Sequence, residues 1–334
     1  MEKAFNIREV ARIAGVSPAT VSRVINGSAN VSAEKRERVL QVVSQTDFVP
    51  NEAARALFKK SARLIGLIIP SVRNPFFTEL AGIIDRTASA HGYRLFLCNV
   101  GDDLEKEKAA FQMLVSMNAD GIIIASNTEG IEEHIENCRI PVVAVDSRLN
   151  TNAVNGYVYS DYRQGGRLAA EHLIRCGCRN IVCIQGPQRF FTARERFEGY
   201  REVCRERGLP VCTVTCDYDF DAGLAMTEEL LRTYPDVDGI IACNDVVAAS
   251  TYKILHKKSI PVPDRIQLIG YDDVNLSRLI SPELTTISQP IEDLAVRATE
   301  LIIESKGKDK NGECFVFPVR LKIRDTTKKE ESES

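Results

Sequence analysis

The chain has 334 residues, of which 44% are hydrophobic and 27% are charged, a composition typical of a globular protein with more than one domain. No apolar run reaches the ~18 residues that a membrane span needs, and the N-terminus lacks the apolar stretch of a secretory signal. We therefore expect a cytoplasmic protein without a membrane partner. Ten scattered cysteines without a CxxC pair and four widely spaced histidines argue against zinc ribbons, disulfide frameworks and other metal sites. We expect reduced, mostly buried thiols, no metal and no cofactor.

Charge is distributed unevenly along the chain. The net charge is −3, yet residues 1–60 carry ten Lys and Arg against six Asp and Glu, which makes +4 there and −7 in the remainder. A basic head on an acidic body is expected when only the head contacts nucleic-acid phosphates.

Residues 6–46 contain the patterns of three short helices. In the first helix, Ile7, Val10, Ala11 and Ala14 have the spacing of one buried face. These apolar positions predict that the first helix packs against its neighbours.

The second helix is expected from Pro18 to Asn26, because Ser17 is a good N-cap and proline suits the first helical position. We expect its Val21 and Val24 to lie in the core.

Ser32 is expected to cap a third helix, whose Val39, Val42 and Val43 face the same core. Two helices joined by a tight turn and backed by a third form a helix-turn-helix.

From Leu64 onward, apolar runs alternate with amphipathic helical stretches; the runs are LIGLIIP, RLFLCN, GIIIAS, VVAVD, NIVCIQG, GIIACND and IQLIGYDD. This alternation predicts parallel sheets covered by helices on both faces. Since the pattern restarts after about Ser160, we expect two similar lobes with a ligand cleft between them.

The expected domain boundaries follow from these patterns. They are 1–49 for the helix-turn-helix domain, 50–60 for a hinge helix or linker, 61–160 plus 290–317 for the N-lobe, 161–289 plus 318–327 for the C-lobe, and 328–334 for a disordered tail.

Polar residues recur where the apolar runs stop: Asn74 with Phe76 and Phe77, Asp146, Asn244 with Asp245, and Asp272. Carboxylates and amides can bond to vicinal hydroxyls, while aromatic faces cover the C–H surface of a sugar ring. This combination favours a neutral polyol over a nucleotide.

The string VARIAGVSPATVSRVING, followed by VS and then FVPNEAARAL, resembles the lactose/galactose-repressor family, and the resemblance runs from about Ile7 to about Thr327. It implies an all-α helix-turn-helix head and an α/β sensor of the two-lobed periplasmic-binding-protein type. It also implies an oligomer that binds near-palindromic operator DNA and changes affinity when an effector enters the cleft. Because no heptad-rich C-terminal tail is present, we expect a homodimer.

By the same resemblance, the second helix reads DNA, with base-reading positions at Pro18, Ala19 and Arg23. A guanidinium can donate two hydrogen bonds to guanine, a pairing worth roughly 1 to 3 kcal/mol of discrimination. Further residues of this helix are suited to phosphate contacts. They are Ser17, Thr20, Ser22 and Asn26.

Leu57 matches the family's leucine that wedges into a minor-groove step at the operator centre and kinks the DNA. Arg55 and Asn51 would then lie near the groove and the DNA backbone.

The sensor is similar to periplasmic sugar-binding proteins of the ribose-binding kind, which implies a ribose-like pentose as effector. The matching positions are Asn74, Phe76, Phe77, Arg196, Phe220, Asn244, Asp272 and Gln289. Two places depart from that pattern. The ribose-binding pattern has an Arg directly after the Asp, whereas in this chain Asp146 is followed by Ser147 and then Arg148, and either of these could take that place. The pattern also has an Asn at the end of the third strand, where this chain has Ser126, with Asn127 one position later. Fructose or sucrose therefore stay open as effectors.

No GxSxG, Walker or GxGxxG motif is present, so an enzyme is not expected. A transport-type sugar-binding protein would share the cleft, but the head opposes that alternative. The sequence predicts a repressor of a sugar utilisation operon, with ribose as the first choice of sugar. Binding of the sugar is expected to release the repressor from its operator. Corepression, with the opposite sign, stays open.

Overall fold

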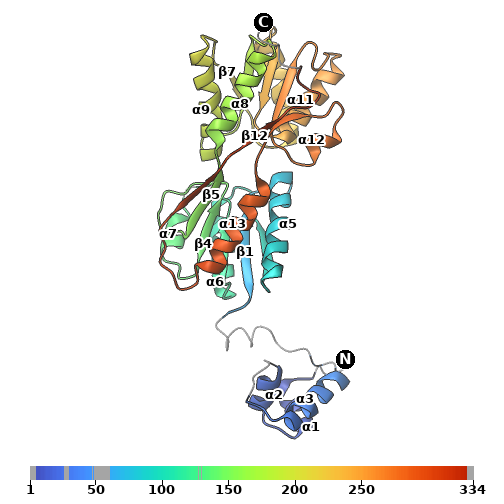
Figure 1. Ribbon diagram of the computed structural model, residues 1–334, viewed down its shortest axis with the longest axis vertical. Helices are drawn as coiled ribbons and strands as arrows, with labels where there is room; N and C mark the ends of the chain where they lie inside the picture. The colour runs from blue at the N-terminus through green and yellow to red at the C-terminus, as the bar shows by residue number, and fades with distance from the viewer. Residues whose placement is uncertain are drawn as a thin grey trace. The chain divides into compact units, whose positions relative to one another are not determined.

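The computed structural model describes residues 5–25, 30–46, 48, 61–126, 128 and 130–328 (Figure 1). The chain divides into two compact units, residues 1–62 and 63–334. Among the described residues, no helix has both the length and the apolar character needed to span a bilayer.

The first unit contains three helices within its described residues: α1 (Ile7–Ala14), α2 (Pro18–Ile25) and α3 (Ala33–Gln45). The expected helix-turn-helix is therefore present. Its core is formed by small and medium apolar side chains, namely Val10, Ala11, Ala14, Val21, Val24, Val39, Val42 and Phe48.

Two details of this unit differ from expectation. Ile7 is 36% exposed, because it is the first residue of α1 and lies past the small core that three short helices can form. Ser32 holds the N-cap position of α3, but its side chain makes no capping bond; only its backbone carbonyl accepts, from the Arg36 N–H at 3.0 Å. By contrast, Asn6 and Glu9 form a reciprocal capping box at the start of α1.

The second unit contains two six-stranded sheets within its described residues, each forming the centre of one lobe. The N-lobe sheet has the order β11-β5-β4-β3-β1-β2 and all its pairs are parallel. The elements of this lobe are β1 (Leu64–Ile69), α5 (Pro75–Ala90), β2 (Arg94–Asn99), α6 (Leu104–Ser116), β3 (Gly121–Ile124), α7 (Glu132–Glu136), β4 (Val142–Val145), β5 (Gly156–Ser160), α13 (Ile291–Glu304) and β11 (Cys314–Phe317).

The C-lobe sheet has the order β12-β10-β9-β8-β6-β7, and its edge strand β12 pairs antiparallel with β10. This edge is the one departure from the expected parallel arrangement within the described residues. The elements of this lobe are α8 (Tyr162–Arg175), β6 (Ile181–Gln185), α9 (Phe191–Glu206), β7 (Cys212–Thr215), α10 (Phe220–Thr233), β8 (Gly239–Ala242), α11 (Asp245–Lys257), β9 (Gln267–Asp272), α12 (Leu276–Leu279), β10 (Thr285–Ser288) and β12 (Arg320–Lys322).

Helices cover both faces of each sheet, as the apolar runs predict. In β1, Ile65 and Leu67 belong to the cluster formed with α5 and α13, whereas Ile68 belongs to the cluster formed with α6. This alternation follows from the two-residue period of a strand, and burial on both faces explains why the run is continuously apolar.

The chain passes between the lobes three times within residues 130–328: from β5 to α8, from β10 to α13, and from β11 to β12 (Figure 1). Asp146 directly follows β4 in the N-lobe, and Asp272 is the last residue of β9 in the C-lobe. Carboxyl ends of strands from both lobes therefore supply polar side chains to the cleft. All ten cysteines are free thiols, and seven of them are buried.

Candidate functional site

Helix α2 of the first unit divides its residues between a core face and an outer face. Val21 and Val24 are buried, as expected. The Ser17 Oγ accepts the Thr20 N–H at 3.2 Å and lies 2.9 Å from the Thr20 hydroxyl, so Ser17 caps the helix. The Arg23 side chain is exposed.

The other positions expected to contact DNA on α2 are also accessible: Ser17, Pro18 and Ala19 are exposed, and Thr20 and Ser22 are half-buried. Asn26, Asn51, Arg55 and Leu57 lie outside the described residues. The arrangement places one exposed guanidinium among small polar side chains, which suits a surface that reads one base and contacts phosphates around it.

The centre of the second unit is a buried polar network around Arg196 of α9. Its guanidinium donates to the Cys243 carbonyl at 2.8 Å and lies 3.5 Å from an Asp272 carboxylate oxygen. It also stacks 3.8 Å from the centroid of the Tyr271 ring and 5.3 Å from that of Tyr162. The cation is thus held by two rings and a carboxylate in a region of low dielectric.

Two carboxylates extend this network. Asp146 accepts the Tyr162 hydroxyl at 2.5 Å, and Asp272 accepts the Gln289 amide at 2.8 Å. Both have positive φ angles, 52° for Asp146 and 107° for Asp272, a conformation that non-glycine residues rarely adopt. Such backbone strain persists only where the surroundings enforce it, and it is typical of ligand sites.

Burial changes the protonation of both carboxyl groups. It raises the pKa of Asp146 to about 6, against the opposing effects of Arg196 and of the Tyr162 hydroxyl. It likewise raises the pKa of Asp272, against those of Arg196 and Gln289. Because desolvation disfavours the charged form, a ligand that donates hydrogen bonds to these carboxylates would stabilise their ionised state.

Two glycines allow α9 to bring Arg196 to this position. A Cβ on Gly166 of α8 would lie 2.0 Å from the Arg196 backbone oxygen, and one on Gly199 would lie 1.9 Å from the Arg163 oxygen. The helices therefore cross with their backbones in contact, which only glycine permits.

Several buried polar atoms at this centre have no hydrogen-bond partner within the described part of the chain. They are Arg196 Nε, Asn244 Nδ2, Tyr271 Oη, Gln289 Oε1 and Ser147 Oγ. An unpaired buried polar atom costs roughly 1 to 3 kcal/mol, so their concentration at one place indicates a site for a polar ligand.

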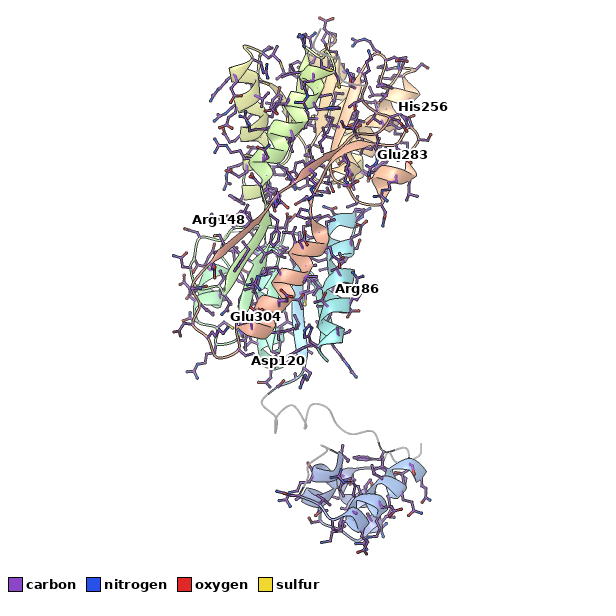
Figure 2. The ribbon with its side chains drawn as sticks, viewed as in Figure 1. Arg86, Asp120, Arg148, His256, Glu283 and Glu304 are labelled. Carbon is purple, nitrogen blue, oxygen red and sulfur yellow. The ribbon has the colours of Figure 1, made fainter. Side chains whose placement is uncertain are left out.

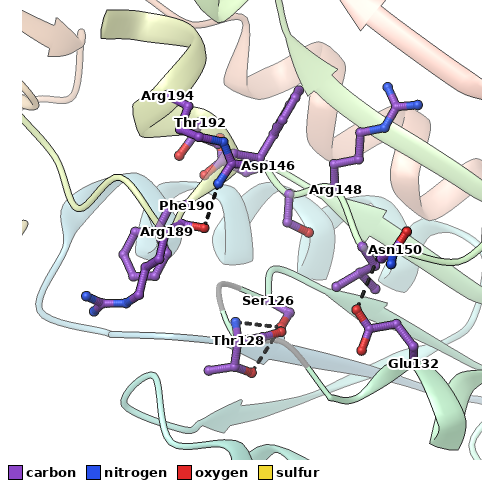
Figure 3. A pocket seen from close by; sticks show the side chains of 13 residues that line it. Ser126, Thr128, Glu132, Asp146, Arg148, Asn150, Arg189, Phe190, Thr192 and Arg194 are labelled. Carbon is purple, nitrogen blue, oxygen red and sulfur yellow. Dashed lines mark hydrogen bonds between the residues drawn. The ribbon is translucent and has the colours of Figure 1, made fainter.

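Two cavities open beside the network, and both are lined by Arg189 and Phe190. One, of about 610 Å³, is lined by Ser147 among others and is called the Ser147 cavity below. In Figure 3, Ser126 and Thr128 of the N-lobe lie across it from Phe190 and Thr192 of the C-lobe. The cavity therefore lies between the lobes.

The second cavity, of about 740 Å³, is lined by Phe220 and is called the Phe220 cavity below. Volumes of this size are those of small-molecule sites.

The expected effector residues fall into three groups. Ser126, Asp146 and Arg148 line the Ser147 cavity; Asn74, Phe77 and Phe220 line the Phe220 cavity; and Arg196, Asn244, Asp272 and Gln289 are in the buried centre. Phe76 lies in the N-lobe core and lines neither cavity.

Several of these side chains also have local structural roles. Asn74 caps α5 by accepting the Phe76 N–H at 3.1 Å, and Asn244 caps α11 by accepting the Val247 N–H at 2.8 Å. Ser126 bonds to Thr128. A cap bond occupies one lone pair of the amide oxygen, so the Asn244 amide group still has free donors.

The two residues after Asp146 point in different directions. Ser147 is 3% exposed and belongs to the buried centre, whereas Arg148 is exposed and donates to the Tyr159 hydroxyl at 3.3 Å (Figure 2).

Arg189 and Phe190 were not expected from the sequence, nor were Tyr162, Tyr218 and Tyr271. Phe190 is buried and stacks on Tyr218 with ring centroids 6.1 Å apart, and the Arg189 guanidinium lies 4.3 Å from the Phe190 ring centroid. The sequence feature that could have indicated Phe190 is the aromatic pair Phe190-Phe191, which directly precedes the segment that carries Arg196.

Comparison with known families gives two matches that together span nearly the whole chain. Residues 6–51 match the family described as bacterial regulatory proteins, lacI family. Residues 62–324 match the family described as periplasmic binding proteins and sugar binding domain of LacI family.

Individual relatives agree with these matches. The ribose operon repressor of Halalkalibacterium halodurans is 40% identical over 323 residues, which are 96% of this chain and 97% of the relative. A periplasmic binding protein/LacI transcriptional regulator from Alkaliphilus metalliredigens, solved in complex with D-xylulofuranose, is 36% identical, covers 80% of this chain and all of its own, and superposes with a TM-score of 0.73. The lac repressor dimer bound to operator and the anti-inducer ONPF is 26% identical, covers 97% of this chain and 99% of its own, and has a TM-score of 0.85.

Proposed function

Because the chain belongs to the lacI family of bacterial transcription regulators, which are not enzymes, we propose that it represses a ribose utilisation operon and leaves its operator when ribose binds between the two lobes. The observation that carries the ribose assignment is the buried network around Arg196. The network holds buried donors and acceptors without a partner among the described residues, and Phe77 and Phe220 line one of the two cavities. The vicinal hydroxyls of a sugar can bond to these donors and acceptors, and the C–H face of the sugar ring can pack against the two phenylalanine rings.

In this proposal Arg196, Asp146, Asp272, Asn244 and Gln289 bond to sugar hydroxyls. The remaining effector contacts come from Asn74, Phe77, Ser126, Arg148 and Phe220. Phe76, which the sequence pattern also suggested, packs in the N-lobe core instead. A neutral sugar that donates to Asp146 and Asp272 would offset part of the cost of burying their charges.

The DNA-binding part of the proposal assigns base reading to Pro18, Ala19 and Arg23, with Arg23 as the main contributor. Ser17, Thr20, Ser22, Asn26 and Asn51 contact the DNA backbone, while Leu57 and Arg55 act at the minor groove. Two copies of the chain bind one near-palindromic operator, as the lac repressor dimer binds its own.

The coupling between the two activities is thermodynamic linkage. Ribose binds one arrangement of the lobes better than another, and operator DNA prefers the other arrangement. A coupling free energy of about 1 to 3 kcal/mol would change operator affinity by about 5 to 150-fold.

A ketopentose is the second candidate effector, because the Alkaliphilus metalliredigens relative binds D-xylulofuranose and is 36% identical. A five-membered ring with similar hydroxyls would use the same buried donors and acceptors.

The test is an operator-binding titration by the purified chain, with ribose, xylulose, fructose or sucrose added in turn. We expect ribose to lower operator affinity at least fivefold, in line with a typical coupling free energy. An increase in affinity would replace induction by corepression. A response to another sugar and none to ribose would overturn the ribose assignment.

A further inference from the structure

The two cavities beside the buried centre differ in the sign of their charge. The Ser147 cavity is lined by Arg148, Arg189 and Arg194 and by two carboxylates, Glu132 and Asp146. The Phe220 cavity is lined by two arginines and by four carboxylates: Arg73, Arg189, Asp102, Asp217, Asp219 and Asp221. With all of these groups ionised, their formal charges total +1 in the first cavity and −2 in the second. Building on the proposed function, we propose that the site for the pentose also accepts its phosphate ester and binds it more tightly, with the phosphate in the Ser147 cavity.

The carboxylates of the Ser147 cavity are already bonded within the protein. Glu132 accepts the Gly130 and Asn150 backbone N–H groups at 2.7 and 3.3 Å, and Asp146 accepts the Tyr162 hydroxyl. The three arginines outnumber these two carboxylates, so the lining has an excess of one positive charge. A phosphate dianion matches guanidinium donors better than a neutral hydroxyl does, because charge-assisted hydrogen bonds are about twice as strong as neutral ones.

The start of helix α9 contributes further donors. Phe190 holds its N-cap position and makes no side-chain capping bond, and Phe190, Phe191 and Thr192 at the start of this 16-residue helix line the cavity. The first backbone N–H groups of a helix have no partner within the helix. The positive end of the helix dipole also favours an anion there. By contrast, α10 beside the Phe220 cavity is capped by Asp219.

An independent observation points to the same place. Ser147 lines the cavity and is 3% exposed, and its hydroxyl has no partner within the described residues. A phosphate oxygen would accept this O–H while its other oxygens accept from Arg189, Arg194 and the first turn of α9.

Two of these arginines extend from the chain segment that begins α9. The Arg194 guanidinium donates to the backbone carbonyls of Gln188 and Arg189 at 3.1 and 2.9 Å, which holds it over the start of the helix (Figure 3). Arg189 packs over the Phe190 ring. A regulator with this site would respond to the product of a phosphoryl transfer to the free sugar.

Isothermal titration calorimetry on the full chain tests the proposal with three ligands: ribose, ribose 5-phosphate and inorganic phosphate. We expect ribose 5-phosphate to bind on the order of tenfold more tightly than ribose, with an affinity that falls as salt is added, whereas that of ribose does not. Equal or weaker binding of the phosphate ester overturns the phosphate site and leaves the ribose proposal standing. Binding of neither sugar overturns both, and inorganic phosphate binding as tightly as the ester shows a free-phosphate site instead.

Variants assign the effect to this cavity. Arg189→Gln and, separately, Arg194→Gln should each weaken ribose 5-phosphate on the order of tenfold. Arg194→Gln should leave ribose unchanged, because Arg194 lines the Ser147 cavity and not the Phe220 cavity. The control is Arg207→Gln, which removes an exposed charge at the C-cap of the same helix, roughly 24 Å along its axis. It should change neither affinity. If Arg194→Gln weakened both ligands equally while its thermal midpoint stayed unchanged, Arg194 would not contact the phosphate.

Discussion

The DNA-facing side of α2 and the polar centre of the sensor use polar side chains in opposite ways. On α2, the residues proposed to contact DNA are exposed or half-buried, so water can bond to them when no DNA is present. In the sensor, Arg196, Asp272 and Gln289 are largely buried, and some of their polar atoms have no partner among the described residues. Removing a residue of the first kind, apart from the helix cap Ser17, should change only binding, whereas removing one of the second kind should change stability as well.

The largest effect is expected for Arg196→Ala. It leaves the buried Asp272 without its cation, so the free energy of unfolding should fall by roughly 3 to 5 kcal/mol and the sugar response should disappear. Urea denaturation and an operator titration with and without sugar measure the two outcomes.

Operator binding without sugar should survive in Arg196→Ala, since the head has its own core. Arg207→Ala, at the exposed end of the same helix, is the control and should behave as the native chain. A variant of native stability that still responds to sugar would contradict the role of the network.

An intermediate effect is expected from pH, because burial raises the pKa of Asp146 from its ordinary 3.8 to about 6. As pH rises between these values, the unfolded chain releases this proton first, and so the free energy of unfolding should fall. Above pH 6 this contribution levels off, after a total change of up to about 3 kcal/mol. Urea denaturation between pH 4 and 8 measures the slope. Asp146→Asn should make the slope shallower, with the remainder due to Asp272, whose pKa burial also raises. An unchanged slope in that variant would assign the effect to other groups.

The smallest effect on the protein itself is expected for Arg23→Ala, which should leave the free energy of unfolding unchanged because the side chain is exposed. Operator discrimination at one base pair should fall by roughly 1 to 3 kcal/mol. Binding to a set of single-base operator variants measures this loss. Ser22→Ala should instead weaken all sequences alike. If Arg23→Ala did the same, Arg23 would be a phosphate contact.

Local sequence patterns were sufficient for much of the fold. The seven apolar runs became strands β1, β2, β3, β4, β6, β8 and β9. For all of these except the edge strand β2, which is largely exposed, burial on both faces of a parallel sheet explains the continuous apolar character. The remaining strands were not foreseen: β5, β7, β10, β11 and β12. They lie at or next to a sheet edge, where pairing with a neighbouring strand rather than composition decides the structure.

The sequence by itself determined the classes of residue at the strand ends, the capped second helix of the head and the alternation that produces two lobes. Only the tertiary structure decided which polar atoms meet. Ser147 turns inward while Arg148 turns outward, and Arg196 reaches Asp272 because Gly166 lets two helix backbones touch. These contacts join residues that are far apart in the chain, so they depend on how helices and sheets pack, and no local periodicity carries that information.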